Sequence, residues 1–235
     1  MSMRVSVVIP TYNCAARLVQ ALESVAAQTY ARERIEIVVI DDGSGDDTAE
    51  RVARFAAGAA PETRYVRQSN AGPAAARNHG LRLARGDAIA FLDADDRWQP
   101  DKLAAQLPLL GGEVGLVYCG NSFVDADGQP LAGYVRTIPA LRGDILLPLF
   151  CEFFLLTSAV VLPKPAIDAV GAFQRRLRRG AAAAALRASG QSEPARLRAR
   201  RAHRSGHADA FPARTCGLCR APSRRRGAPH RALPL

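Results

Sequence analysis

The sequence predicts an α/β fold in which a mostly parallel β-sheet carries helices on both faces. Short β-branched runs alternate with segments whose apolar residues recur at helical spacing, and this pair occurs four times. The connections are only a few residues long, as in strand–helix–strand units. The run at 88–92 is apolar at every position, which is typical of a strand buried on both faces.

Four strand–helix units are expected in the first half of the chain. Their residues, strand before helix, are 5–9 and 15–28, 35–40 and 46–57, 64–68 and 74–84, and 88–92 and 100–110. Asn13 is a candidate N-cap for the first helix. Gly43 permits a positive φ in the turn after the second strand, and Pro73 suits the first turn of the third helix.

The elements expected after residue 110 are shorter. They are a strand at 114–119, a hairpin over 121–135 with Asp127-Gly128 as its turn, a helix capped by Asp144, a strand at 157–162, a turn at 163–165 and a helix at 166–170.

Composition and charge change sharply at residue 173. Residues 1–173 hold 16 Lys and Arg against 20 Asp and Glu, a net charge of −4, whereas residues 174–235 hold 16 Arg and two acids, a net charge of +14. The tail has seven Leu and Phe and no Val or Ile, too little apolar area to offset its ordering entropy. We therefore expect one domain over 1–173 and a disordered, Arg/Ala-rich tail over 174–235.

Three carboxylates follow the strand at 88–92. Extended geometry would direct Asp93 and Asp95 to one side, roughly 6–7 Å apart. Converging carboxylates repel each other unless a positive charge lies between them, and a hard divalent cation of the Mg²⁺ type meets that need. A solvated acidic turn with a helix cap would fit the same residues.

Aromatic and charged residues also follow the other predicted strands. Tyr12 would either stack on a base or serve as a packing or turn residue. Asp41 and Asp42 would form an acidic pocket, as in a phosphoacceptor domain, or one of them would only form the turn. Arg77 would meet a diphosphate or form a surface salt bridge. The ends of parallel strands share one edge, so these residues should lie close together.

Four segments, taken in order and spacing, resemble the family 2 glycosyltransferases, which have a Rossmann-like GT-A fold. The segments are 5–13, 39–44, 70–78 and 91–96, and the resemblance extends over about residues 4–173. It implies that a sugar moves from a nucleotide-diphospho-sugar, with a UDP-sugar favoured, to a hydroxyl of a glycan or another acceptor. The implied reaction depends on Mg²⁺ or Mn²⁺ and inverts the sugar's configuration.

The resemblance also implies a role for seven residues. Pro10 and Tyr12 would line the nucleobase pocket, and Asp42 would accept a hydrogen bond from the base. Asn70 lies in a matching segment and is expected to bind the donor, and Arg77 would lie near the base or the diphosphate. Asp93 would approach the ribose or the metal, and Asp95 would bind the metal.

No residue can be assigned as the catalytic base. The family pattern places an acidic pair after a Gly-x-Phe-Asp-like segment, but here Gln174 follows Gly171-Ala172-Phe173 and no Glu-Asp pair comes later. One explanation is an Arg-rich extension that binds RNA or an anionic membrane surface. The one we favour is a reading-frame error in a GC-rich gene, which would leave a truncated donor-binding remnant with impaired turnover. Nucleic acid is not the expected partner.

The sequence shows no apolar run near 18 residues, and residues 1–4 lead directly into a strand. We therefore expect neither a membrane span nor a signal peptide. Cys14, Cys119 and Cys151 are scattered, which is typical of reduced thiols. A cytoplasmic location is expected, with peripheral association at the inner face of the membrane as a further possibility.

Overall fold

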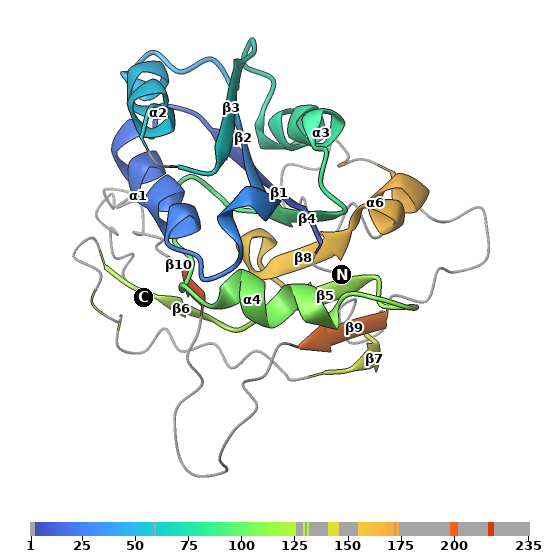
Figure 1. Cartoon of the computed structure of the whole chain (residues 1–235). Helices are drawn as coiled ribbons and strands as arrows, with labels where there is room; N and C mark the ends of the chain where they lie inside the picture. The colour runs from blue at the N-terminus through green and yellow to red at the C-terminus, as the bar shows by residue number, and fades with distance from the viewer. Residues whose placement is uncertain are drawn as a thin grey trace, which may run out of the picture.

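A mixed β-sheet lies at the centre of the structure (Figure 1). The structure, a computed structural model, describes residues 3–58, 60–125, 129, 131, 141–145, 155–171, 173, 198–201 and 216–218. In this part of the chain the strands form an eight-stranded sheet, in the order β3-β2-β1-β4-β8-β5-β9-β7, and a two-stranded sheet of β10 and β6.

The first half of the sheet is parallel, as predicted. Its strands are β1 (Val5–Thr11), β2 (Ile35–Asp41), β3 (Glu62–Arg67) and β4 (Ala88–Phe91). The helices that follow them are α1 (Ala15–Ala26), α2 (Thr48–Ala56), α3 (Pro73–Leu83) and α4 (Lys102–Gln106), with 3-10 turns η1 (Arg32–Arg34) and η2 (Leu107–Leu109). The four predicted strand–helix units are therefore confirmed, and their loops leave from one edge of the sheet.

The second half of the sheet contains shorter strands. They are β5 (Leu116–Tyr118), β6 (Asn121–Phe123), β7 (Gly143–Asp144), β8 (Val160–Pro163), β9 (Arg198–Arg201) and β10 (Cys216–Leu218), with η3 (Thr157–Ala159) and α6 (Lys164–Val170) beside β8. Strand β8 is antiparallel to both β4 and β5, so the sheet changes direction next to β4.

Several predictions for this half need correction. The predicted cap residue Asp144 is exposed in β7 and pairs with β9, and the helix expected after it lies outside the described residues beyond Ile145. Helix α6 begins at Lys164 rather than 166, since Pro165 is compatible with a first helical turn. Residues 157–159 form a 3-10 turn rather than strand. In the tail, residues 198–201 and 216–218 form the short strands β9 and β10. The rest of the tail lies outside the described residues, so its disorder stays a prediction.

The predicted hairpin is present in its described residues. Asp125 N donates to Gln129 O at 2.9 Å, and Leu131 N donates to Phe123 O at 3.0 Å. Its expected turn, Asp127-Gly128, lies outside the described residues. The described residues of the second arm, Gln129 and Leu131, therefore pair with the first arm as the sequence indicated.

Helices cover both faces of the sheet (Figure 1). On one face Leu22 of α1, Val52 of α2 and Leu103 of α4 join one hydrophobic cluster. On the other face Leu81 of α3 and Ile167 of α6 pack against a second cluster. Strand residues alternate between these clusters, which confirms the predicted α/β architecture.

Helix α3 lies unusually close to β1. A Cβ added at Gly80 would come within 2.3 Å of a methyl carbon of Val8 and 3.4 Å of Ile40. Such a contact cannot form without movement of the helix or the strand. Because residue 80 is glycine, helix α3 can lie against the sheet. This places Arg77 and Asn78, which precede Gly80 in α3, close to the sheet.

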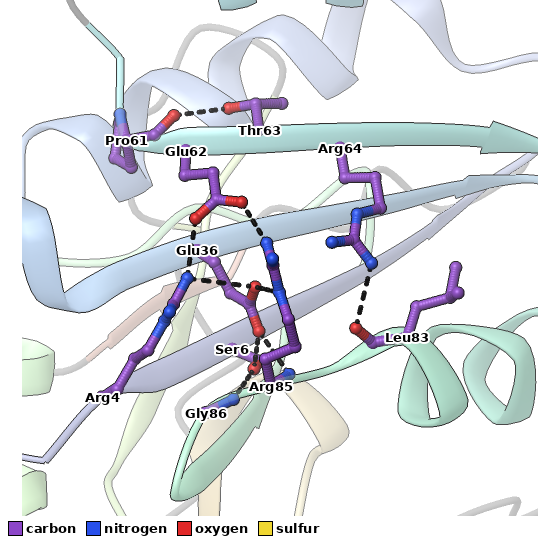
Figure 2. A network of polar contacts seen from close by, with 10 residues as sticks. All are labelled: Arg4, Ser6, Glu36, Pro61, Glu62, Thr63, Arg64, Leu83, Arg85 and Gly86. Atoms are coloured by element: carbon purple, nitrogen blue, oxygen red, sulfur yellow. Dashed lines mark hydrogen bonds and ion pairs between the residues drawn. The ribbon is translucent and has the colours of Figure 1, made fainter.

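A network of ion pairs and hydrogen bonds joins β1, β2 and β3 at the edge of the sheet opposite the loops that follow these strands (Figure 2). Glu36 of β2 is only 1% exposed and accepts hydrogen bonds from Ser6 and from the backbone and side chain of Arg85. Arg4 lies 3.5 Å from Glu36 and 2.7 Å from Glu62, which also pairs with Arg85. The network links β1, β2 and β3 to the turn before β4, and it satisfies a buried carboxylate.

No helix in the described part of the chain is long and apolar enough to cross a bilayer. Neither Cys14 nor Cys119 forms a disulfide within the described residues, and Cys151 lies outside them.

Candidate functional site

The loops after β1 and β2 are joined by hydrogen bonds. Asn13 N donates to Ser44 Oγ at 2.9 Å, and Gly45 N donates to Asn13 Oδ1 at 2.8 Å. Asn13 has a φ of +47°, a left-handed conformation that asparagine tolerates. The predicted N-cap role of Asn13 is therefore wrong: its side chain binds the neighbouring loop, and Asp46 Oδ2 accepts from Ala15 N at 3.1 Å.

Asp41 is the turn-forming member of the acidic pair at the end of β2. Its Oδ1 accepts a hydrogen bond from Ser44 N at 2.8 Å, and its Oδ2 accepts one from the Tyr65 hydroxyl at 2.5 Å. Burial and this bond to Asp41 raise the pKa of Tyr65. Gly43 has a φ of +87°, so the predicted tight turn is confirmed.

Asp42 connects β2 to the loop that follows β3. It is 4% exposed, and its Oδ1 accepts hydrogen bonds from Gln68 Nε2 at 2.7 Å and Ala71 N at 2.9 Å. Its Oδ2 accepts one from Gly72 N at 2.8 Å. A carboxylate offers about four lone-pair sites, so these three bonds leave acceptor capacity on Asp42. Asn70, at the start of this loop, is exposed.

Gln68 is a site residue that sequence reasoning missed. Besides its bond to Asp42, its Oε1 lies 2.8 Å from His79 Nδ1. Gln68 therefore joins the end of β3 to both β2 and α3. No motif marks this residue, because the contact depends on three elements that come together only in the fold.

Arg77 and Asp93 form a largely buried ion pair. Arg77 Nη2 lies 2.5 Å from Asp93 Oδ1, and Arg77 is 7% exposed. Its Nε is buried and has no hydrogen-bond partner among the described residues. Arg77 thus forms the salt bridge that was the alternative to a diphosphate contact, although the bridge is largely buried rather than at the surface. The pair brings α3 to the acidic loop after β4, and the diphosphate contact of Arg77 stays a prediction.

Ser158, in the 3-10 turn η3 directly before β8, holds the acidic loop that follows β4. Its Oγ accepts a hydrogen bond from Asp93 N at 3.0 Å and donates one to Asp96 Oδ2 at 2.6 Å. Its carbonyl oxygen accepts one from Trp98 Nε1 at 2.8 Å. Ser158 is fully buried, and it too was missed because no local pattern identifies it.

Asp95 shares an electrostatic environment with residues of two other loops. Burial raises the pKa of the Cys14 thiol, the Asp95 carboxylate raises it further, Arg17 lowers it, and Asp46 raises it. Such influence requires the charges to be close. The Asp95 carboxylate after β4 therefore lies close enough to influence the thiol in the loop after β1, while hydrogen bonds join the loops after β1 and β2.

The acidic loop has the ligand chemistry of a Mg²⁺ or Mn²⁺ site, although the described residues contain no cluster of three or more metal-ligating side chains. Such ions in phosphate-binding sites usually take one or two carboxylates and complete their shell with water and substrate phosphates. Asp95 is half-buried beside the other loops. A single hard oxygen ligand of this kind, with Asp93 nearby in sequence, fits that requirement.

Tyr12 is the one large hydrophobic side chain exposed among the described residues, at 52%. This exposure excludes a packing role for Tyr12. The residue lies in the bend after β1, so the turn alternative stays open and stacking on a base stays a prediction. Pro10 is buried in β1 opposite Ile40 of β2. Tyr12 thus presents an accessible ring at the same edge of the sheet as Asp42 and Asp95.

Comparisons with known proteins agree with this geometry. The family model for glycosyl transferase family 2 matches residues 6–153. An uncharacterized glycosyltransferase of Nostoc sp. is 43% identical over 101 residues, which cover 43% of this chain and 31% of that protein. The Escherichia coli enzyme WfaP, a UDP-Glc:alpha-D-GlcNAc-diphosphoundecaprenol beta-1,3-glucosyltransferase, is 34% identical over 166 residues, which cover 69% of this chain and 62% of WfaP.

Solved structures share the fold. S. aureus TarS in complex with UDP-GlcNAc matches with a TM-score of 0.67 and 21% identity, over 94% of this chain and 60% of TarS. The mannosyltransferase PcManGT from Pyrobaculum calidifontis, in complex with GDP-Man and Mn²⁺, matches with a TM-score of 0.67 and 22% identity, over 96% of this chain and 59% of PcManGT. The predicted GT-A fold is therefore confirmed. The chain spans between 17% and 62% of the lengths of the curated relatives it matches.

Proposed function

Because the chain belongs to glycosyl transferase family 2, we propose that it transfers a sugar from a nucleotide-diphospho-sugar to an acceptor hydroxyl, with a divalent cation and with inversion. Three observations support this proposal. Asp42 is hydrogen-bonded to the loop before α3, Arg77 of α3 pairs with Asp93 in the loop after β4, and Asp95 of the same loop influences Cys14 after β1. A site for a charged nucleotide requires such convergence, and an open α/β sheet provides it at its carboxyl edge.

The nucleoside would lie over the loops after β1 and β2. The exposed ring of Tyr12 would stack on the base, and Pro10 would line the same pocket. Asp42 would accept a hydrogen bond from the base with the capacity that its three internal bonds leave. Asn70, exposed on the loop that Asp42 holds, would contact the donor.

The diphosphate would lie between α3 and the acidic loop. Arg77 brings a buried guanidinium whose Nε has no hydrogen-bond partner among the described residues, and a guanidinium binds phosphate oxygens well. Asp93 would approach the ribose or the metal, and Asp95 would bind the metal. When bound, Mg²⁺ or Mn²⁺ supplies Lewis-acid stabilisation of the negative charge that develops on the diphosphate.

The relatives indicate the class of donor. TarS has been solved with UDP and UDP-GlcNAc and PcManGT with GDP-Man and Mn²⁺, and WfaP is named for UDP-glucose. We therefore infer a UDP-sugar as the favoured donor and a glycan hydroxyl as the acceptor. The chain has no assigned base, which an inverting reaction needs to deprotonate the acceptor.

A second candidate function is donor binding with impaired turnover. The observation that favours it is Gln174 at the position where the family pattern has an acid, with only Glu193 and Asp209 as later acids. These three residues lie outside the described part of the chain. This candidate and the transferase share one donor site and differ only in turnover.

Release of nucleoside diphosphate tests both candidates. The full chain is incubated with Mn²⁺, with a panel of alkyl glycosides whose free hydroxyls can accept the sugar, and, separately, with UDP-GlcNAc, UDP-glucose or GDP-mannose. Binding of each donor is measured in parallel. A transferase releases UDP or GDP, and Asp95→Asn slows release by about a hundredfold, since a Lewis acid supplies several kcal/mol. The control, Asp168→Asn, changes an exposed residue of α6 and should leave release unchanged.

The outcomes separate the candidates. Binding without release supports the donor-binding remnant over the transferase. Absence of binding with all three donors would overturn the donor site itself. Release that persists in Asp95→Asn at the wild-type rate would contradict the metal role given to Asp95.

A further inference from the structure

The side-chain amide of Asn78 holds the backbone of Phe173. Phe173 N donates to Asn78 Oδ1 at 2.7 Å, and Asn78 Nδ2 donates to Phe173 O at 2.8 Å. The two residues are 95 positions apart. An asparagine amide carries an accepting oxygen and a donating NH₂ group, which match the N–H and the carbonyl of a backbone residue. Asn78 therefore fixes both the position and the orientation of Phe173.

The ring of Phe173 in turn packs beside the guanidinium of Arg77. Its ring is 5.1 Å from that of Phe91, edge to face at 89°, and Arg77 Cζ lies 5.8 Å from the Phe173 ring centroid. Phe173 is 7% exposed. A guanidinium within about 6 Å of an aromatic face is attracted to it, so Phe173 contributes to the position of Arg77.

Among the described residues, an ion pair and the Phe173 ring contact the head of Arg77. Its described polar contact is the ion pair with Asp93, and its Nε has no hydrogen-bond partner among the described residues. The Phe173 ring is therefore a substantial part of what directs the guanidinium. Asn78 follows Arg77 directly in α3. One helical turn therefore carries both Arg77 and the residue that positions Phe173 beside it.

We propose that Asn78 is a positioning residue for the donor diphosphate: through Phe173 it directs Arg77 toward the phosphates. This inference rests on the proposed function, because it needs a diphosphate at Arg77. It gives Phe173, which precedes the expected position of the acidic pair, a role on the donor side.

The test compares ligands that differ by one phosphate. UDP and UMP are titrated calorimetrically into the full chain with Mn²⁺. Asn78→Ala should weaken UDP binding about fivefold, the size of a typical net hydrogen-bond contribution, and should change UMP binding much less. Phe173→Met removes the aromatic face but keeps apolar bulk, and it should copy this selective loss. The matched control is Phe55→Met, in α2 and remote from Arg77.

A double-mutant cycle distinguishes positioning from a general loss of structure. In an Arg77→Lys background, Asn78→Ala should cause no further loss of UDP affinity, because its effect acts through the guanidinium. Equal losses for UDP and UMP, or additive losses with Arg77→Lys, would overturn the inference. If Asn78→Ala does not fold by its melting curve, Asn78→Asp, which keeps the acceptor and loses the donor, takes its place in the cycle.

The two proposals fail differently. Wild-type chain that binds neither nucleotide overturns the proposed function and, with it, this inference. Wild-type chain that binds UDP normally, with Asn78→Ala, Phe173→Met and wild type indistinguishable, overturns only the role of Asn78.

Discussion

Asp42 accepts a hydrogen bond from the backbone nitrogen of Gly72 at 2.8 Å, so the end of β2 is tied directly to the loop that begins α3. The same carboxylate binds Gln68 and Ala71. A residue expected to face the ligand is therefore also a structural support of the site. The two roles lead to separate predictions for stability and for binding.

Asp42→Asn should lower the free energy of unfolding by roughly 1–3 kcal/mol. The amide replaces one oxygen with a donor, which then faces a backbone N–H or the Gln68 amide. Urea denaturation followed by circular dichroism measures the change. Asp47→Asn is the control, since it removes only a half-exposed pair with Arg51 and should cost about 0.5 kcal/mol or less. Equal stability of the two variants would show that the loop does not depend on Asp42.

Ser158→Ala should loosen the acidic loop. The change removes the acceptor for Asp93 N and the donor to Asp96, and both partners are then left without this bond in a buried region. We expect the apparent affinity for UDP in Mn²⁺ to fall about tenfold and the melting temperature to fall as well. Thr29→Ala, which removes an exposed hydroxyl bonded to Pro100 O, should do neither. Unchanged UDP affinity in a folded Ser158→Ala variant would count against this support.

The stability of the fold should depend on pH through Glu36. Burial by itself raises the pKa of this carboxyl, but hydrogen bonds from Ser6 and Arg85 and the charge of Arg4 outweigh it and lower the pKa below its usual 4.5. A depressed pKa contributes stability above the unfolded-state value, and that stability is lost as the pH falls through the folded-state value. Urea midpoints should therefore fall on acidification below about pH 4.5.

Glu36→Gln tests this assignment. Because glutamine does not titrate, the urea midpoint below about pH 4.5 should fall less steeply with pH in the variant than in the wild type. Glu62→Gln, whose side chain is 53% exposed, should change the dependence much less. Identical acid limbs for wild type and Glu36→Gln would remove Glu36 as the cause.

Tyr12→Ala should weaken UDP binding by about tenfold, because base–aromatic stacking contributes ~1–3 kcal/mol. Its stability should be close to that of the wild type, since the ring is 52% exposed. Tyr12→Phe keeps the ring and should bind UDP almost normally. Loss of affinity in Tyr12→Phe equal to that in Tyr12→Ala would instead assign the effect to the hydroxyl.

The order of elements could be predicted because local patterns determine it. Apolar spacing identified the strands and helices of the first half, and the parallel order then placed Tyr12, Asp42 and Asp95 at one edge. Gly43 and Pro73 behaved as their backbone chemistry requires. These inferences need only neighbouring residues and the geometry of parallel strands.

The supporting contacts could not be predicted in this way. Ser158 binds a residue 65 positions away, and Asn78 binds one 95 positions away. Asn13 shows the same limit, since a tertiary bond from Gly45 prevails over its local tendency to cap a helix. Asp144 has good capping chemistry but lies in β7, where pairing with another strand determines its conformation.

The most direct test of the account is the Mn²⁺ dependence of UDP binding to the full chain, measured by calorimetry in wild type and Asp95→Asn. We predict that wild type binds UDP in Mn²⁺ and loses about tenfold or more in affinity when EDTA removes the ion. Asp95→Asn should show the weaker affinity whether or not Mn²⁺ is present. A wild-type affinity that EDTA does not change, and that Asp95→Asn retains, would contradict a nucleotide site built around a metal-binding carboxylate.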